Sequence, residues 1–279
     1  MKETQKLKAD YEKLSLADDF MFCKIMVKPK NCIEMLQRLT GNKIERIKAV
    51  AEQKVIQVTS DSKGIRYDVY VEDNNNIVYD AEMQRKRSEK ETGIEILSKR
   101  VRAYQGLMDV NLLEKGGSYK ELKNSYVIFI CTFDPFGRNL CCYEFENICK
   151  DVEELKLLDG RKILFFNTKG TIKNISPEAE VFLDYIEKKK VGDRYTESLE
   201  KQVKMARMNK EWRVEYMKTY FHDIDVRDEG REEGIEQGKI IQLIELVRDG
   251  DLSIEVAIKK SNLSKEEFMK YFNGESNEQ

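Results

Sequence analysis

The chain has 279 residues, of which 41% are apolar and 36% are charged. This length exceeds one average domain, the apolar share can form a hydrophobic core, and the high charged share indicates long solvated helices. The net charge of −2 excludes a global positive field that would attract nucleic acid, so contact with a phosphate backbone needs a local basic patch.

Composition also limits the location and the chemistry. No apolar run approaches the roughly 20 residues that span a bilayer, and the segment from Met1 to Lys6 leads into no signal-type apolar region. We therefore expect a cytoplasmic protein without a membrane partner. Six cysteines without a CxxC motif indicate free thiols rather than a zinc site. His222 is the single histidine, so carboxylates are the main catalytic candidates.

The N-terminal part predicts helices followed by a strand. Asp18 and Asp19 suit the positive end of a helix dipole, Pro29 interrupts the pattern, and Gly41 suits a helix C-terminus. In order, we expect a frayed lead-in over 1–15, helices over 16–26 and 32–39, a strand over 53–59 and a loop over 60–64.

Two segments with period-two alternation, 65–71 and 77–84, predict a β-hairpin. The run from Glu72 to Asn76 between them favours a turn, because Asn and Asp side chains bond nearby backbone and tolerate positive φ. A turn centred on Asn75 places Asp68 and Glu82 opposite each other, with Cβ atoms roughly 5 Å apart. The face expected to be buried carries Ile65, Tyr67, Val69, Val71, Ile77, Tyr79, Ala81 and Met83.

The other face of the hairpin is polar and has two possible meanings. It carries Arg66, Asp68, Tyr70, Val78, Asp80, Glu82 and Gln84. Two opposed carboxylates repel unless a cation or a proton lies between them, which favours a functional site. The alternative is an ordinary amphipathic hairpin with a solvated outer face, which is common in antiparallel sheets.

The segment after the hairpin is basic and then helical. A cluster from Arg85 to Arg87 precedes a helix over 93–113, on which Arg100 and Arg102 lie largely off the apolar face. Such charges usually form a solvated face, but here they could hold a phosphate backbone near the carboxylates. The continuously apolar segment 125–133 predicts a central strand buried on both faces. Strands over 140–146 and 162–167 then complete a mixed α/β core that ends near residue 175.

From Pro177 onward the sequence is helical and highly charged. Ser176 and Pro177 suit the N-cap and first position of a helix, and Ser264 begins a capping-box pattern. We expect helices over 177–190, 194–220 and 240–247, then two short helices after Ser253 and Ser264. Gly230, Gly234 and Gly238 lie on one side of a predicted helix. Each glycine makes helix formation less favourable by about 1 kcal/mol, so we expect this segment to be a weak helix unless it packs against another element.

The chain is thus predicted to have two parts, 1–175 and 176–279. The mixed charges of the two short helices at the end favour packing or self-association over the reading of a DNA groove by a helix-turn-helix.

At the hairpin, the sequence resembles the PD-(D/E)XK nuclease superfamily. It is most similar to the Rpn-type recombination-promoting nucleases, also described as PD-(D/E)XK nuclease family transposases. The resemblance covers most of the chain and includes the glycine pattern of the tail. Its matching segments are 18–22, 61–64 with 66–70, 79–84, 100–105 and 126–137.

The resemblance implies a restriction-endonuclease-like core, in which helices flank a mixed central sheet, and a set of site residues. Asp68 resembles the metal-binding aspartate and Glu82 the acidic residue of the motif, whereas Gln84 stands where the superfamily has lysine. Asp19, or its neighbour Asp18, resembles an acidic residue of the first helix, and Gln105 a polar helix residue that faces the site. The implied metal is Mg²⁺ or Mn²⁺, and the expected DNA contacts are Arg66, Arg85, Lys86, Arg100 and Arg102.

The function implied is a metal-dependent endonuclease that hydrolyses phosphodiester bonds in double-stranded DNA and promotes recombination or transposition. Activity is expected to be slow, because a neutral glutamine at position 84 can only orient water or phosphate. A homodimer through the C-terminal helices would supply two sites for two strands. The alternative is a weakly active or inactive nuclease-fold protein that acts as a DNA-binding or protein-interaction module.

Overall fold

The computed structural model describes residues 2–56, 65–85, 93–113 and 117–273. The chain divides into two compact units, Met1–Arg213 and Val214–Gln279. This division differs from the predicted boundary at residues 175 and 176. The helices over 177–208 belong to the first unit, because they pack against the helices that cover its sheet.

A six-stranded mixed sheet forms the centre of the first unit, in the order β1-β2-β3-β4-β8-β5. Strands β1 to β3 are antiparallel, β3, β4 and β8 are parallel, and β5 is antiparallel to β8. The strands are β1 (Ile47–Ile56), β2 (Ile65–Asp73), β3 (Ile77–Gln84), β4 (Asn124–Cys131), β5 (Cys142–Phe145) and β8 (Arg161–Asn167). The strand expected over 53–59 begins earlier, at Ile47, and residues 57–64 lie outside the described residues.

Strand β4 occupies a central position, as its continuous apolar sequence predicts. Its residues Val127 to Cys131 are fully buried, between β3 on one side and β8 on the other. The mixed α/β fold with a helical C-terminal region is therefore confirmed.

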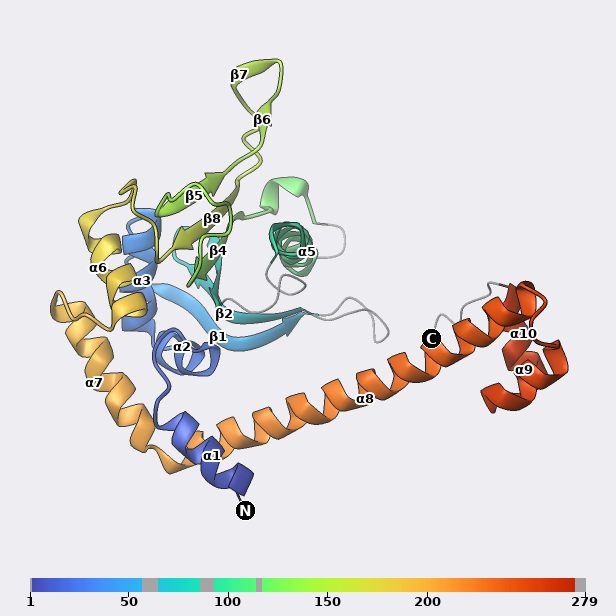
Figure 1. Ribbon diagram of the computed structural model, residues 1–279. Helices are drawn as coiled ribbons and strands as arrows, with labels where there is room; N and C mark the ends of the chain where they lie inside the picture. The colour runs from blue at the N-terminus through green and yellow to red at the C-terminus, as the bar shows by residue number, and fades with distance from the viewer. Residues whose placement is uncertain (1, 57–64, 86–92, 114–116, 274–279) are drawn as a thin grey trace. The chain divides into compact units, whose positions relative to one another are not determined.

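Helices cover both faces of the sheet (Figure 1). Helix α5 lies on one face, and α2 and α3 lie on the other, with α6 and α7 packed outside them. The helices of this unit are α1 (Lys2–Tyr11), α2 (Asp19–Met26), α3 (Pro29–Thr40), α5 (Ile94–Leu112), α6 (Pro177–Lys188) and α7 (Arg194–Met208), with a 3₁₀ turn η1 (Tyr119–Glu121). Leu97, Val101, Tyr104 and Met108 of α5 join strand residues in one core cluster.

The expectation of a frayed lead-in over residues 1–15 is wrong. Helix α1 buries Leu7 and Tyr11. The Tyr11 hydroxyl donates to the carbonyl oxygen of Ala206 at 2.6 Å, and Arg207 Nε donates to the carbonyl oxygen of Leu14 at 2.7 Å. The local pattern does not predict this helix, because its stability comes from contacts with α7, almost 200 residues away in the sequence.

The single helix expected over 194–220 is also wrong, since Asn209 divides it. Asn209 has an extended backbone, with φ −73° and ψ 115°. Its side-chain oxygen accepts from the backbone N–H groups of Glu211 and Trp212 at 2.9 and 3.0 Å, and so caps helix α8 (Lys210–Arg248). Asparagine is among the best N-cap residues, which explains why the break falls here.

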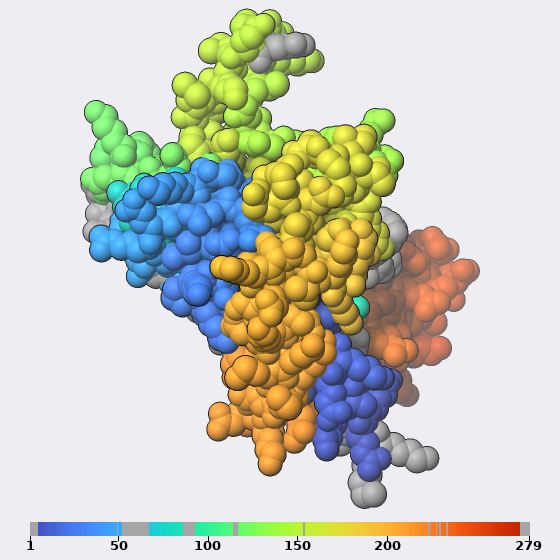
Figure 2. Space-filling view, turned by 90° about the vertical axis from the view of Figure 1, so that its left-hand side faces the viewer, coloured from blue at the N-terminus to red at the C-terminus, as the bar shows by residue number. Residues whose placement is uncertain are grey.

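A two-stranded arm, β6 (Ile148–Cys149) and β7 (Val152–Lys156), stands out from the sheet (Figures 1 and 2). An isolated hairpin of this size is marginally stable in water. Large apolar side chains are exposed on and just after the arm, at Ile148, Val152, Leu155, Leu157 and Leu158. This hairpin is not among the elements expected from the sequence.

The second unit has its own small core. The end of α8 packs with α9 (Ile254–Ser261) and α10 (Lys265–Asn273) through a cluster of four buried residues, Ile240, Ile244, Ala257 and Phe268. The capping box predicted at Ser264 is present: Ser264 N–H donates to the Glu267 carboxylate at 2.9 Å, and Glu267 N–H donates to Ser264 Oγ at 3.2 Å.

The three glycines of the predicted stripe lie within α8. A Cβ atom at Gly230, Gly234 or Gly238 would meet no other atom within 4 Å. None of the helices in the described part of the chain combines the length and the apolar character needed to cross a membrane.

Candidate functional site

The β2–β3 hairpin has the register that the sequence predicts. Val69 pairs with Ala81 and Tyr70 with Asp80, which places Asn75 at the centre of the turn. The buried carboxylate of Asp73 holds this turn. It accepts from the backbone N–H groups of Asn75 and Ile77 at 2.8 and 2.9 Å, and from the Tyr79 hydroxyl at 3.2 Å.

Asp68 and Glu82 directly follow the last paired residues, Val69 and Ala81, and the side chain of each bonds the backbone of the facing strand. Asp68 N–H donates to Glu82 Oε1 at 2.9 Å, and Met83 N–H donates to Asp68 Oδ2 at 3.1 Å. Each carboxylate is therefore held by a backbone N–H of the facing strand. These two hydrogen bonds fix the positions of both carboxylates.

The alternative of a solvated outer face is wrong, because both faces of β3 are buried. All its residues from Val78 to Gln84 are buried. Helix α5 covers the polar face, where Tyr70 and Val78 belong to the core cluster beneath it. The carboxylates of this face thus lie between the sheet and a helix.

Tyr67 was expected on the opposite face from Tyr70, and this is wrong. Both rings belong to the cluster beneath α5, with centroids 5.7 Å apart, and the Tyr67 hydroxyl donates to the carbonyl oxygen of Tyr104 at 2.9 Å. Strict alternation fails at Asp68, where the backbone ladder is interrupted by the two carboxylates.

Asp80 is the least satisfied group of the site. It is fully buried, and neither carboxylate oxygen has a hydrogen-bond partner in the structure. Burial, and then the charge of Asp68, raise the pKa of Asp80 well above its usual value. Burial, and then the charge of Asp80, likewise raise the pKa of Glu82, against the Asp68 N–H and Arg100. A buried ionised carboxylate without partners is costly, so Asp80 favours a proton or a cation nearby.

Arg100 of α5 provides a cation at this cluster. Its Nη1 donates to Gln84 Oε1 at 3.0 Å, and its Nη2 donates to the Tyr104 hydroxyl at 2.9 Å and lies 3.4 Å from Glu82 Oε2. Gln84 Nε2 lies 3.5 Å from the same Glu82 oxygen. Arg100, expected to contact the DNA backbone, lies against Gln84 and Glu82.

The acidic residues of the first helix lie near the end of β3. Asp18 precedes α2, accepts from Ser15 N–H at 2.7 Å and from Ser15 Oγ at 3.0 Å, and forms an ion pair with Arg85, the residue after β3. Asp19 is the first residue of α2 and is half-buried.

The remaining predicted residues are spread more widely. Gln105 is buried on α5, and its Nε2 has no hydrogen-bond partner in the structure. Arg102 is exposed on the same helix. Lys86 and the side chain of Arg66 lie outside the described residues.

The donor atoms of this site suit a hard cation. Asp68 and Glu82 offer oxygen, and Mg²⁺ binds proteins through one or two carboxylates while keeping positions for water and phosphate. In the described part of the chain, no group of three or more His, Cys, Asp or Glu side chains is placed to hold a metal. A cation here would therefore depend on water and substrate for its other ligands.

The six cysteines are free, as the sequence predicts, and four of them are buried. Burial raises the pKa of Cys32 to about 12, so this thiol stays protonated at neutral pH.

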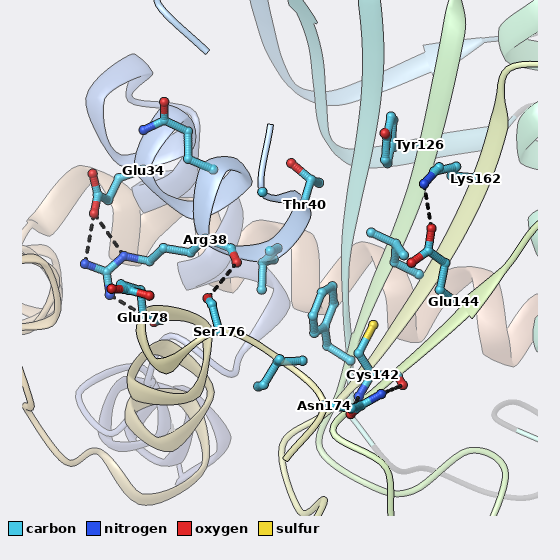
Figure 3. Close-up of a pocket in the computed structure, with 16 residues that line it drawn as sticks. Glu34, Arg38, Thr40, Tyr126, Cys142, Glu144, Lys162, Asn174, Ser176 and Glu178 are labelled. Atoms are coloured by element: carbon cyan, nitrogen blue, oxygen red, sulfur yellow. Dashed lines mark hydrogen bonds and ion pairs between the residues drawn. The ribbon is translucent and has the colours of Figure 1, made fainter. Parts of the chain in front are cut away.

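A separate pocket of about 550 Å³ lies on the sheet face opposite α5 (Figure 3). It is bounded by α3, by the segment before α6 and by strands β4, β5 and β8. Its charged side chains include paired ones: Lys162 Nζ lies 2.6 Å from Glu144 Oε1, and Arg38 Nη2 lies 2.9 Å from Glu34 Oε1. The hairpin, with its unpartnered carboxylate, is the better candidate site.

No family model, curated protein or solved structure matches the chain. Function is therefore inferred from the chemistry of the hairpin cluster and from the motifs in the sequence.

Proposed function

We propose that the protein is a metal-dependent DNA endonuclease of the PD-(D/E)XK type, related to the Rpn recombination-promoting nucleases. The observation that carries the proposal is the opposition of Asp68 and Glu82 across β2 and β3. Asp80 and Gln84, on the same face of β3, belong to the same cluster. Hydrolysis of phosphodiester bonds in double-stranded DNA would then promote recombination or transposition.

Asp68 and Glu82 would hold Mg²⁺ or Mn²⁺. When bound, such an ion polarises the phosphate and lowers the pKa of a bound water. The backbone N–H groups of Asp68 and Met83 keep the two carboxylates in fixed positions. Glu82 would also accept a proton from that water, as a carboxylate next to the metal can. Gln84 orients water or phosphate through its amide.

The basic residues around the cluster would position the DNA. Arg85 and Arg102 are exposed, at the end of β3 and on α5. Contacts of this kind fix the register of a duplex without reading its sequence. A homodimer through the C-terminal helices would bring one site to each strand.

A second candidate function is a nuclease-fold module that binds DNA or protein without cleaving. Two observations favour it: Glu82 and Gln84 are only 2% and 8% exposed, and both motif carboxylates accept backbone hydrogen bonds, as structural carboxylates do. The endonuclease would cleave DNA when a divalent metal is present, whereas the binding module would not cleave DNA with any metal.

Plasmid cleavage with Mg²⁺ or Mn²⁺ distinguishes them. The parent is compared with Asp68→Ala and Glu82→Ala, and with Glu144→Gln as a control whose carboxylate pairs with Lys162 across β5 and β8. We expect each site variant to lose roughly a hundredfold or more in rate, because it removes several kcal/mol of transition-state stabilisation. The control should cleave like the parent.

Each contrary result has a distinct meaning. Equal cleavage by the parent and the site variants would refute the assigned site. If the parent does not cleave with either metal but still binds duplex DNA, the non-catalytic module is the better description.

A further inference from the structure

Phosphodiester hydrolysis builds negative charge on the phosphate, and Gln84 cannot neutralise it. Preorganised positive groups at such a position supply a large part of the catalysis in many enzymes. Gln84, whose amide lies 3.5 Å from Glu82 Oε2, is neutral. The charge must then come from elsewhere if the site is efficient.

Arg100 reaches this position from α5. Its closest contacts are to neutral groups, at 3.0 Å to Gln84 Oε1 and at 2.9 Å to the Tyr104 hydroxyl. The contact to Glu82 Oε2, at 3.4 Å, is longer than the 2.7–2.9 Å of a strong charge-assisted bond. The guanidinium is therefore positioned by neutral partners, and Glu82 does not fully neutralise its charge.

Packing holds the guanidinium in one orientation. It lies 5.4 Å from the ring centroid of Tyr104 and 5.5 Å from that of Phe129. An arginine guanidinium is not deprotonated in proteins, so this oriented group carries a positive charge.

The same side chain is still open to an incoming phosphate. Its exposed fraction is 32%, against 3% for the side chain of Glu82. A guanidinium has five N–H donors in a planar fork that matches phosphate oxygens. The contacts to Gln84, Glu82 and Tyr104 engage its two terminal nitrogens and leave donors for a ligand.

We infer that Arg100 is a catalytic residue, whose guanidinium donates to the scissile phosphate and supplies the positive charge that Gln84 lacks. This role differs from a contact to the flanking DNA backbone, and it rests on the proposed phosphodiester hydrolysis. Gln84 then acts as a positioning residue, which accepts from Arg100 and fixes the guanidinium beside Glu82.

The test removes the positive charge of Arg100 and places a lysine at position 84 instead. Cleavage of a labelled DNA duplex with Mg²⁺ is measured at saturating enzyme for the parent, Arg100→Ala, Arg100→Lys and the double variant Gln84→Lys/Arg100→Ala. Arg161→Ala is the matched control, because Arg161 also ties α5 to the sheet, through Asp109, but lies away from the carboxylates. Thermal unfolding of each variant checks folding, and affinity for the same duplex in Ca²⁺ measures binding separately.

We expect Arg100→Ala to lower the cleavage rate of bound DNA by roughly 10²-fold, as for the loss of one preorganised donor, with a much smaller change in affinity. Arg100→Lys should keep part of the rate. The double variant should recover at least about tenfold over Arg100→Ala, since its lysine restores the charge.

A structural role for Arg100 predicts a different pattern. The double variant would then be no faster than Arg100→Ala, and this result, or equal rates for the parent and Arg100→Ala, would overturn the inference while leaving the endonuclease proposal intact. Absence of cleavage by the parent with Mg²⁺ or Mn²⁺ would overturn the proposed function and this inference together.

Discussion

At the scale of single residues, two fully buried aspartates on the hairpin differ in the hydrogen bonds that their carboxylates accept. Asp73 accepts hydrogen bonds from two backbone N–H groups and one hydroxyl. Asp80 is equally buried, but among the described residues no hydrogen-bond donor faces either of its oxygens. An ionised carboxylate buried in this way is costly, so Asp80 lowers the stability of the folded chain when it is charged.

Asp80→Asn should therefore stabilise the metal-free protein, and increasingly so at higher pH. Because the pKa of Asp80 is raised in the folded state, above the usual value near 3.8, the unfolded chain releases its proton at lower pH than the folded chain. The free energy of unfolding then falls as pH rises from about 4 through the raised pKa. An asparagine side chain has no proton to release, so the variant avoids this fall in the free energy of unfolding. Its gain in Tm over the parent should therefore be small near pH 4 and reach several degrees at pH 8.

Thermal unfolding in EDTA from pH 4 to pH 9 measures this effect. Asp73→Asn is the control, and it should lower Tm across the range, because its carboxylate is already fully bonded. A difference between Asp80→Asn and the parent that does not change with pH would contradict the prediction.

At the scale of elements, the turn before β3 determines the geometry of the site. Asp73 fixes the hairpin turn, and a shift of one residue in register would move every side chain of β3 to the other face. Asp68 would then no longer lie opposite Glu82. The turn and the site are thus parts of one element.

Asp73→Ala should weaken this element without touching the carboxylates. It leaves two backbone N–H groups and the Tyr79 hydroxyl without their acceptor, so the free energy of unfolding should fall by about 1–3 kcal/mol. Urea denaturation followed by circular dichroism measures the change. Asp151→Ala, at the exposed turn between β6 and β7, should stay within about 0.5 kcal/mol of the parent. Equal effects of the two changes would show that Asp73 does not hold the turn.

At the scale of the whole molecule, the chain combines a sheet unit and a small helical unit, each with its own core. Helix α8 leads from one to the other and carries exposed apolar side chains, among them Val214, Phe221, Val226 and Ile235. The open space around its three glycines would permit close approach by another helix. We propose self-association through the tail, which would give the proposed nuclease two sites for two DNA strands.

Deletion of residues 225–279 tests this proposal. The shortened chain keeps Trp212, whose ring lies beside Lys24 of α2, so the sheet unit should stay folded. Light scattering should then give the mass of a single chain for the deletion variant and a multiple of the chain mass for the parent. The same number of chains per particle in both would refute self-association through the tail.

The sequence by itself determined the local features of this protein. Alternation and an asparagine-rich turn fixed the hairpin and its register, a continuous apolar run fixed β4, and Ser264 fixed the start of α10. These features depend on residues close together in the chain, which is why patterns reveal them.

The tertiary structure alone decided what covers the hairpin. Three features arise from residues far apart in the sequence. They are the burial of the carboxylate face, the position of Arg100 beside Gln84 and Glu82, and the formation of helix α1. Periodicity marks the faces of an element, but the partner that covers a face follows from packing. For this reason the sequence predicted Asp68 and Glu82 as a pair, whereas only the fold showed that Asp80 is left unsatisfied and that an arginine from α5 reaches the site.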